Sequence, residues 1–311
     1  MANAPSPDDH DSALMTTGII GVGVLAVAFS APLITAIAAP ALAVAFWRNA
    51  LGALAGAPFT LVARRRELAG LLGPQRRTLA LAALAGLTLA LHFGLWIPSL
   101  RLTSVTASTA LATTTPLWTV ALLRLQGTVV PRGVLAGVVL ALAGVVVVTG
   151  VDASGSAEAL QGDLLALGGG VAGAGYVVVG AQVRRTVGTA SYTLVAYTTC
   201  ALALLPVCLL TGSSLSGYSA RAWVELGLLT LLAQLLGHSL LNRALRSAGP
   251  TTVSLAILLE VPGASLVAWL WLGQVPPVAV VPGAALVLVG LAVVIRAQAS
   301  TRRAVEEPLS P

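Results

Sequence analysis

The stretch Pro250–Gly273, PTTVSLAILLEVPGASLVAWLWLG, decides how the rest of this sequence is interpreted. It is long and apolar enough to cross a bilayer as a helix, which takes about 20 residues. Glu260 lies near its middle, where a carboxylate costs roughly 2.5–3.5 kcal/mol on insertion scales. Pro262 has no N–H for the carbonyl of Leu258, and its ring crowds that carbonyl, so we expect the helix to bend or open there.

Two interpretations of Glu260 follow from this position. In the first, it is a structural charge that is bonded to a neighbouring helix. In the second, it is a substrate or proton site, because a freed carbonyl beside a carboxylate at bilayer depth needs a partner or a wet cavity. Ionisable residues inside membrane segments mark functional sites by default, and we favour the second interpretation.

The composition is that of an integral membrane protein. Of 311 residues, 57% are hydrophobic and 9% are charged, with a mean hydropathy of +0.93, whereas a soluble domain carries about 25% charged residues. All 17 basic residues are Arg, and they stand singly or in short groups between apolar runs. There they set membrane topology, and we expect no nucleic-acid partner. Cys200 and Cys208 would lie about 12 Å apart on a straight helix, too far for a disulfide, and are interpreted as packing residues.

Ten apolar segments are candidate membrane helices, and most reach the length needed to cross. Residues 1–13 contain no Lys or Arg, unlike the start of a cleaved signal peptide, and we expect them to form a disordered tail. Residues 297–311 form a second tail. The ten segments are 14–36, 41–63, 78–98, 104–125, 132–150, 162–183, 189–211, 222–245, 250–272 and 278–296.

The distribution of Arg predicts the orientation in the membrane. With the N-terminus in the cytoplasm, only Arg101 and Arg221 fall in outer loops, and Arg48 lies within a segment. Such an excess on one side predicts that both termini are cytoplasmic. The Arg residues on the predicted cytoplasmic side are Arg64, Arg65, Arg66, Arg76, Arg77, Arg124, Arg132, Arg184, Arg185, Arg243, Arg246, Arg296, Arg302 and Arg303.

The chain also repeats itself at a shift of 146 residues. The shift places Pro116 on Pro262 and Gly127 on Gly273, and it places Gly137 and Gly144 on Gly283 and Gly290. Each unit holds five segments, and because five is odd, the second copy is upside down in the membrane. Inverted repeats are typical of transporters that bind substrate near the midplane between the two halves. The predicted units are residues 14–150 and 162–296, joined by an external linker at 151–161.

Polar residues within the segments are the candidate site. Arg48, in AFWRNAL, is interpreted as a partner of Glu260, as a clamp for an anionic substrate group, or as a side chain that snorkels to the outer interface. Thr113 and Thr114 precede Pro116, where the second unit has Glu260 and Pro262. Their hydroxyls can line a cavity or can bond to carbonyls of their own helix around a proline break.

His92 and His238 lie at nearly equivalent positions in the two units. Each fits a packing residue or a proton pathway. Gln234 and Asn242 share a helix face with His238, a pattern that also fits plain contact between helices. Tyr176, in the sixth segment, is a further cavity candidate. The sequence contains no metal-ligand cluster, phosphate-binding glycine loop or hydrolase motif, so we expect no metal, no cofactor and no enzyme activity.

Taken together, these features resemble the EamA-like transporters of the drug/metabolite transporter superfamily over about 15–149 and 161–296. Two departures are that Val261 separates Glu260 from Pro262 and that Gln274, in place of the family's frequent Glu, follows Gly273. The residues that carry the resemblance are Gly162-Asp163-Leu-Leu-Ala-Leu, Leu259-Glu260-Val-Pro262, Trp269-Leu-Trp271-Leu-Gly273-Gln, Gly283, Gly290 and Arg48.

The resemblance implies an all-α membrane protein with ten transmembrane helices in two inverted repeats. It implies a secondary transporter of the bacterial inner membrane that exports small metabolites, amino acids or drugs by alternating access, with proton coupling as one option. The alternative is a non-transporting membrane sensor or assembly partner with the same fold. The expected partners are a small-molecule substrate and the lipid bilayer, and the oligomeric state is left open.

Overall fold

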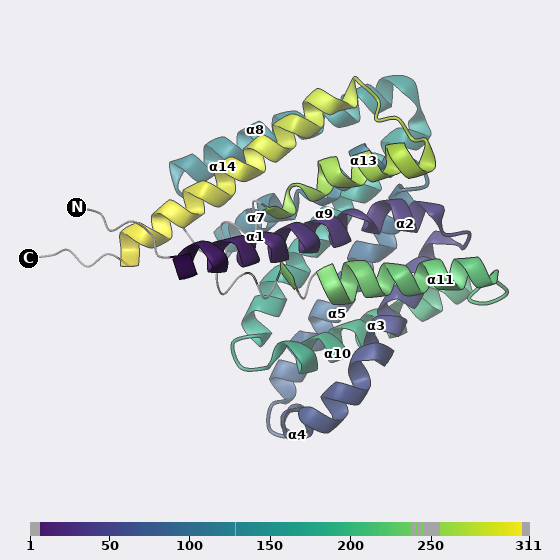
Figure 1. Cartoon of the computed structure of the whole chain (residues 1–311), viewed down its shortest axis with the longest axis vertical. Helices are drawn as coiled ribbons and strands as arrows, with labels where there is room; N and C mark the ends of the chain where they lie inside the picture. The colour runs from purple at the N-terminus through teal and green to yellow at the C-terminus, as the bar shows by residue number, and fades with distance from the viewer. Residues whose placement is uncertain (1–6, 128, 238–239, 242–243, 245–255, 307–311) are drawn as a thin grey trace, which may run out of the picture.

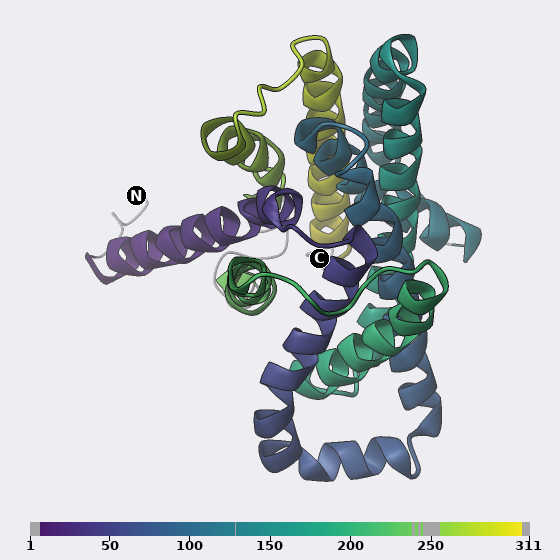
Figure 2. The same ribbon diagram turned by 90° about the vertical axis from the view of Figure 1, so that its right-hand side faces the viewer.

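The computed structural model describes residues 7–127, 129–237, 240–241, 244 and 256–306, with the backbone alone for 7–14, 148–155 and 298–306. Every regular element within these ranges is helical (Figures 1 and 2). In chain order the elements are α1 (Pro7–Ala28), α2 (Ser30–Ala36), α3 (Ala41–Ala63), α4 (Arg65–Leu72), α5 (Arg76–Ser99), α6 (Val105–Ala112), α7 (Thr115–Leu125), α8 (Arg132–Gly155), α9 (Ala157–Val183), α10 (Thr189–Leu210), α11 (Ala220–Leu229), the π-helix η1 (Thr230–Gly237), α13 (Glu260–Leu272) and α14 (Val280–Glu306).

Several of these helices are long and apolar enough to cross a membrane, which confirms a multi-pass membrane protein. α3 has the length, but Arg48 and Asn49 lower its hydropathy. α6, α7 and α13 are shorter, because the predicted segments that contain them are interrupted. The exact number of ten membrane helices therefore stays a prediction. The six candidate spans are Met15–Ala36, Arg76–Ser99, Ala157–Val183, Thr189–Leu210, Ala220–Gly237 and Val280–Ala297.

Helices extend into the predicted N-terminal tail and into the predicted linker. α1 begins at Pro7, inside the range where the sequence predicts a disordered tail. α8 continues to Gly155 and α9 begins at Ala157, so Ser156 alone separates them within the predicted linker at 151–161. The Ser156 side chain accepts a hydrogen bond from the N–H of Ala159 and so caps the start of α9.

Two of the helix interruptions lie directly before a proline. α6 ends at Ala112, and the carbonyl that Pro116 leaves without its helical N–H accepts a hydrogen bond from the Thr115 hydroxyl at 3.2 Å. The turn before α13 is similar, because the carbonyl of Leu258 accepts from the N–H of Val261 at 3.4 Å instead of from Pro262. Local donors thus satisfy both freed carbonyls at these breaks.

α8 and α14 pack side by side along most of their length (Figure 1). A Cβ atom on Gly137 would lie 2.7 Å from the carbonyl oxygen of Gly290, and one on Gly144 would lie 2.6 Å from that of Gly283. Only glycine lets the two backbones approach so closely. We call these four residues the glycine seam. Their pairing order shows that the two helices run antiparallel.

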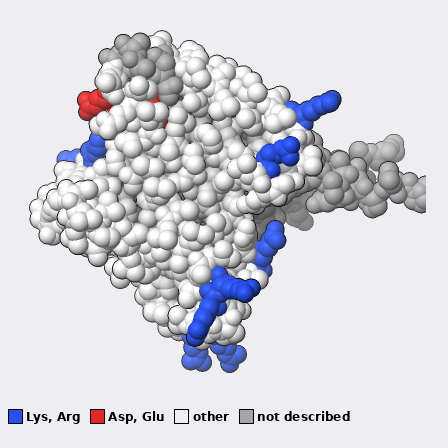
Figure 3. Space-filling model, turned by 180° about the vertical axis from the view of Figure 1, so that it is seen from behind, with Lys and Arg blue, Asp and Glu red and all other residues white. Residues whose placement is uncertain are grey.

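The surface separates into a charged side and a broad apolar band. The start of α1 and the end of α14 lie on the same side of the molecule (Figure 1). In Figure 3, most Arg side chains gather towards that side, and the wide area next to it shows almost no charge. Large apolar side chains such as Leu54, Val139 and Leu270 are exposed, as expected where lipid replaces water.

Candidate functional site

Arg48 lies inside the helix bundle with its charge only partly satisfied. Its side chain is 2% exposed. Nε donates to Oε1 of Gln234 at 3.2 Å, and Cζ lies 4.2 Å from the centre of the Phe93 ring, a distance suited to a cation–π contact. Nη1 is buried without a hydrogen-bond partner. The side chain therefore contacts the protein interior, and the two N–H groups of Nη1 remain for another group.

Gln234 reaches Arg48 from η1, a π-helical segment that the sequence did not predict. π-helical turns are rare and occur frequently at functional sites. Room for the amide comes from Gly52, one turn after Arg48 on α3. A Cβ atom there would lie 2.5 Å from Nε2 of Gln234 and 3.3 Å from Cδ2 of Tyr197.

Asn49 adds a second buried polar group with unused capacity. It is fully buried, and its Nδ2 donates to the carbonyl of Ala45 at 2.9 Å. Its Oδ1 has no partner. An unsatisfied buried polar atom costs about 1–3 kcal/mol, so two of them on adjacent residues need an explanation.

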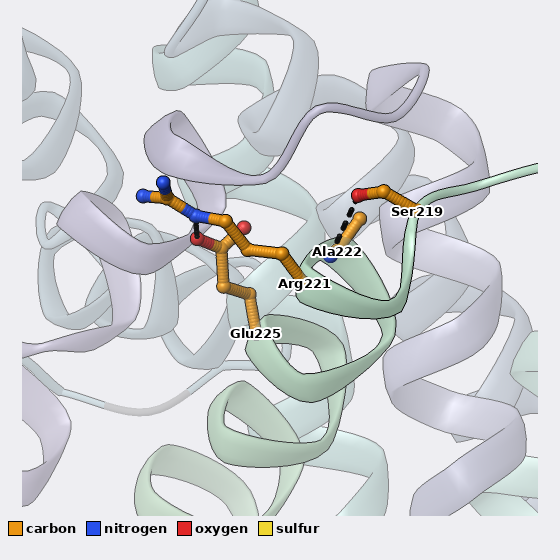
Figure 4. Close-up of polar contacts among 4 residues, drawn as sticks. All are labelled: Ser219, Arg221, Ala222 and Glu225. Carbon is orange, nitrogen blue, oxygen red and sulfur yellow. Dashed lines mark hydrogen bonds and ion pairs between the residues drawn. The ribbon is translucent and has the colours of Figure 1, made fainter.

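Glu260 is the first residue of α13 and is partly exposed, whereas Arg48 lies on α3. No nitrogen–oxygen pair between them is within 4.0 Å, so they form no ion pair. Arg221 and Glu225, at the start of α11, do form one at 2.9 Å (Figure 4). Arg48 and Glu260 thus belong to the two halves of the chain, and neither is held in an ion pair with the other.

The threonines around the α6–α7 break bond to their own helix. The hydroxyl of Thr113 donates to the carbonyl of Ala110 at 2.9 Å, and that of Thr114 donates to the carbonyl of Leu111 at 2.6 Å. The Thr114 hydroxyl also accepts from Nε1 of Trp118 at 3.0 Å. Of the two interpretations of these threonines, the structure shows the one in which their hydroxyls bond to carbonyls of their own helix. A place for them in a substrate pathway stays a prediction.

The other predicted residues lie around this site or outside the described part of the chain. Nδ1 of His92 donates to the carbonyl of Gly169 at 2.7 Å, and its ring stacks on Trp96 with centroids 5.7 Å apart. Tyr176 stacks on Tyr192 between α9 and α10, with centroids 6.0 Å apart. His238 and Asn242 fall outside the residues that the structure describes.

Sequence analysis missed three residues of the site around Arg48, namely Phe93, Tyr197 and Asn49. Phe93 follows His92 directly, and Asn49 follows Arg48, so proximity in the sequence was the available signal for these two. Tyr197 had no such signal, because one aromatic residue in an apolar helix is ordinary.

Two surface pockets lie away from Arg48, Gln234 and Glu260. The first, of about 490 Å³, lies between α7 and α9, and the second, of about 530 Å³, lies where α3 meets α4. The first is lined by Thr119, Leu123, Gln126, Val177, Val178, Gln182, Arg185 and Thr186.

Comparison of the sequence with known protein families gives a match over most of the chain. The sequence profile of the EamA-like transporter family matches residues 16–150 and 160–296, which together make up most of the chain. The chain belongs to the EamA-like transporter family. As an EamA-like transporter, it is a multi-pass membrane protein of the drug/metabolite transporter type, whose partners are a small-molecule substrate and the bilayer.

Solved structures show the same fold for this EamA-like chain. One crystal structure, titled only "Crystal structure of protein", has 20% sequence identity and a TM-score of 0.59. The match covers 94% of this chain and 99% of that chain. At such low identity the likeness concerns the fold alone. A search of curated proteins finds no match.

Proposed function

We propose that this EamA-like chain is a proton-coupled exporter of the bacterial inner membrane that moves a small zwitterionic metabolite, of the amino acid kind, out of the cytoplasm. Arg48 binds the anionic group, and Glu260 binds either the cationic group or a proton. The observation that carries the proposal is the buried, unpartnered Nη1 of Arg48, which forms no ion pair with Glu260. Oδ1 of Asn49, the next residue on α3, is a second buried atom without a partner.

Competition for the Glu260 carboxylate couples the substrate to protons in this proposal. In the empty site, a proton occupies the carboxylate, and the Arg48 charge keeps its contacts with the Phe93 ring and Oε1 of Gln234. When a zwitterion enters, its ammonium group replaces that proton, and its anionic group satisfies Arg48. The proton and the ammonium group therefore compete for one carboxylate, so substrate leaves as protons enter.

The glycine seam supports the inverted arrangement of two five-helix repeats. The 146-residue shift turns the pair Gly137–Gly290 into Gly283–Gly144, and this is the second close contact of the seam. A two-fold axis in the membrane plane would exchange contacts in this way. The matched residues Gly127 and Gly273 also agree, because both have positive φ angles, 89° and 67°.

The exposed charges support cytoplasmic termini. Arg residues gather on the side of the termini (Figure 3), and cytoplasmic loops carry the excess of Arg in inner-membrane proteins. On this orientation, the breaks before Pro116 and Pro262 lie within the membrane, where they allow the two repeats to rock about the central site.

Transport measurements on Glu260→Gln test the coupling. Gln keeps the size and hydrogen bonding of Glu but cannot exchange a proton. Proteoliposomes loaded with a panel of labelled amino acids and other metabolites would be given a pH gradient. We expect the variant to insert normally and to lose proton-driven accumulation, while exchange of labelled for unlabelled substrate continues.

Glu225→Gln is the matched control, since Glu225 pairs with Arg221 outside the central site. It should keep both proton-driven transport and exchange. An unchanged pH dependence in Glu260→Gln would remove Glu260 from the coupling step. Absence of transport of every compound by the wild-type protein would contradict the exporter assignment itself.

A further inference from the structure

Positive charge is concentrated where α3, α4 and the link from α9 to α10 meet. Residues 61–80 contain five Arg and one acidic residue, Glu67. Leu71 of α4 shares a buried apolar cluster with Val183 and Val187, so α4 packs beside the link that carries Arg184 and Arg185. We call residues 59–72 together with 184–188 the arginine corner. It holds five Arg, namely Arg64, Arg65, Arg66, Arg184 and Arg185, with Arg76 and Arg77 following at the start of α5.

The one acidic residue of the arginine corner does not neutralise this charge. One carboxylate oxygen of Glu67 accepts a hydrogen bond from the N–H of Gly188, and the other accepts from the hydroxyl of Ser191 at 2.9 Å. Glu67 thus caps the start of α10. In the described part of the chain, the guanidinium groups of Arg64–Arg66 have no hydrogen bond or ion pair, and all three are exposed.

Exposed Arg residues on the opposite side of the molecule behave differently. Arg101 donates to the carbonyls of Thr35 at 2.9 Å and Ile37 at 2.7 Å, at the end of α2. Arg221 pairs with Glu225 at 2.9 Å (Figure 4). Arg124 and Arg132 are also exposed without a hydrogen bond or ion pair in the described part of the chain, but each stands singly. The arginine corner is distinguished by three successive unpartnered guanidinium groups beside a pocket.

A pocket of about 530 Å³ opens at the arginine corner, and it combines charged and apolar walls. Its apolar wall includes Val62, which is 78% exposed. Phe59 and Leu61 on the same helix end are also exposed. The pocket is lined by Val62, Ala63, Arg64, Arg65, Arg66, Glu67 and Gly188.

We propose that this pocket binds the phosphate of an anionic phospholipid from the surrounding leaflet. Arg64, Arg65 and Arg66 hold the phosphate oxygens, since the guanidinium fork matches phosphate geometry. The acyl chains lie along the exposed apolar surface of Phe59 and Val62. Basic pockets between membrane helices on the cytoplasmic side suit anionic headgroups. The apolar wall favours a lipid over free phosphate, which would leave that wall unused.

Lipid binding by the full-length protein tests this site without any transport measurement, so its failure would leave the exporter proposal untouched. The protein is placed in phosphatidylcholine nanodiscs that contain a small fraction of labelled phosphatidylglycerol, and the bound label is measured. The test variant carries Arg64→Gln, Arg65→Gln and Arg66→Gln. The control carries Arg124→Gln, Arg132→Gln and Arg296→Gln, which remove the same charge elsewhere on the terminus side.

We expect the test variant to bind phosphatidylglycerol about tenfold or more weakly, because it removes the three guanidinium groups that line the pocket, and the control, which leaves the pocket intact, to stay within about twofold of wild type. Equal weakening in both variants would reduce the effect to general attraction and overturn the site. If inorganic phosphate alone binds the wild-type protein and displaces the lipid at millimolar concentration, the pocket is a phosphate site and the lipid proposal is wrong.

Folding is checked by thermal unfolding in the same nanodiscs. Should the triple variant not fold, the single variants Arg64→Gln, Arg65→Gln and Arg66→Gln carry the same test. Each should weaken lipid binding by about threefold, against no change in Arg132→Gln. Unchanged binding in all three single variants would overturn the proposal.

Discussion

Glycine permits a close approach between helices at two places in this molecule, and the two places differ in which atoms lie where a Cβ would be. At the glycine seam between α8 and α14, a Cβ atom on Gly290 would lie 2.4 Å from the backbone nitrogen of Ala141. At the central site between α3 and η1, a Cβ atom on Gly52 would lie 2.5 Å from Nε2 of Gln234. One glycine admits a neighbouring backbone, and the other admits the end of a flexible polar side chain.

The difference indicates which part of the molecule is rigid and which can rearrange. Two backbones in direct contact leave no rotamer to change, so a larger residue must move a whole helix. A glutamine side chain can move by rotation about its own bonds at small cost. The seam thus fixes α8 against α14, and the unsatisfied atoms of Arg48 and Asn49 lie where side chains can still adjust to a ligand.

The largest effect is expected for Gly290→Ala at the glycine seam. The new Cβ would overlap the backbone of α8, and forced overpacking of this kind costs about 1–3 kcal/mol. Thermal unfolding in detergent should show this loss of stability. Gly56→Ala is the control, since nothing lies within 4 Å of a Cβ atom there. Equal stability of the two variants would show that the seam yields without strain.

Arg48→Met should leave folding intact and reduce transport by at least about tenfold, equal to roughly 1.4 kcal/mol. Met fills similar space without a charge, and the contacts it gives up are the hydrogen bond to Gln234 and the cation–π contact with Phe93. No ion-pair partner is abandoned, because Glu260 is not bonded to Arg48. Unfolding temperature and transport would be measured on the same preparation. A large loss of folded protein with transport kept per molecule would make Arg48 a structural residue.

Gly52→Ala should have the smallest effect, and it sharpens the comparison most directly. The new Cβ would lie 2.5 Å from Nε2 at the end of the Gln234 side chain, whereas the new Cβ of Gly290→Ala would lie 2.4 Å from the backbone nitrogen of Ala141. We expect stability within about 1 kcal/mol of wild type. Transport should fall severalfold, because Gln234 must leave its place beside Arg48. A loss of stability as large as that of Gly290→Ala would mean that the central site is as rigid as the seam.

The residues of the central site differ in how visible they are in the sequence. Arg48, Gln234 and Glu260 could be predicted one by one, because charged and amide groups are rare in membrane segments and costly there. Phe93 and Tyr197 could not, since aromatic side chains in apolar helices are common. The π-helical turn of η1 also has no signature, because its apolar run reads as an ordinary helix.

The sequence by itself determined the membrane class, the family and the pattern of matched glycines and prolines. These depend on composition and on spacing along the chain, which apolar segments and their breaks record directly. Only the tertiary structure decided that Arg48 bonds to Gln234 and not to Glu260, and that Glu67 caps α10. Such contacts join residues far apart in the chain. Their distances depend on how each helix is rotated and packed, and short-range patterns do not encode that rotation.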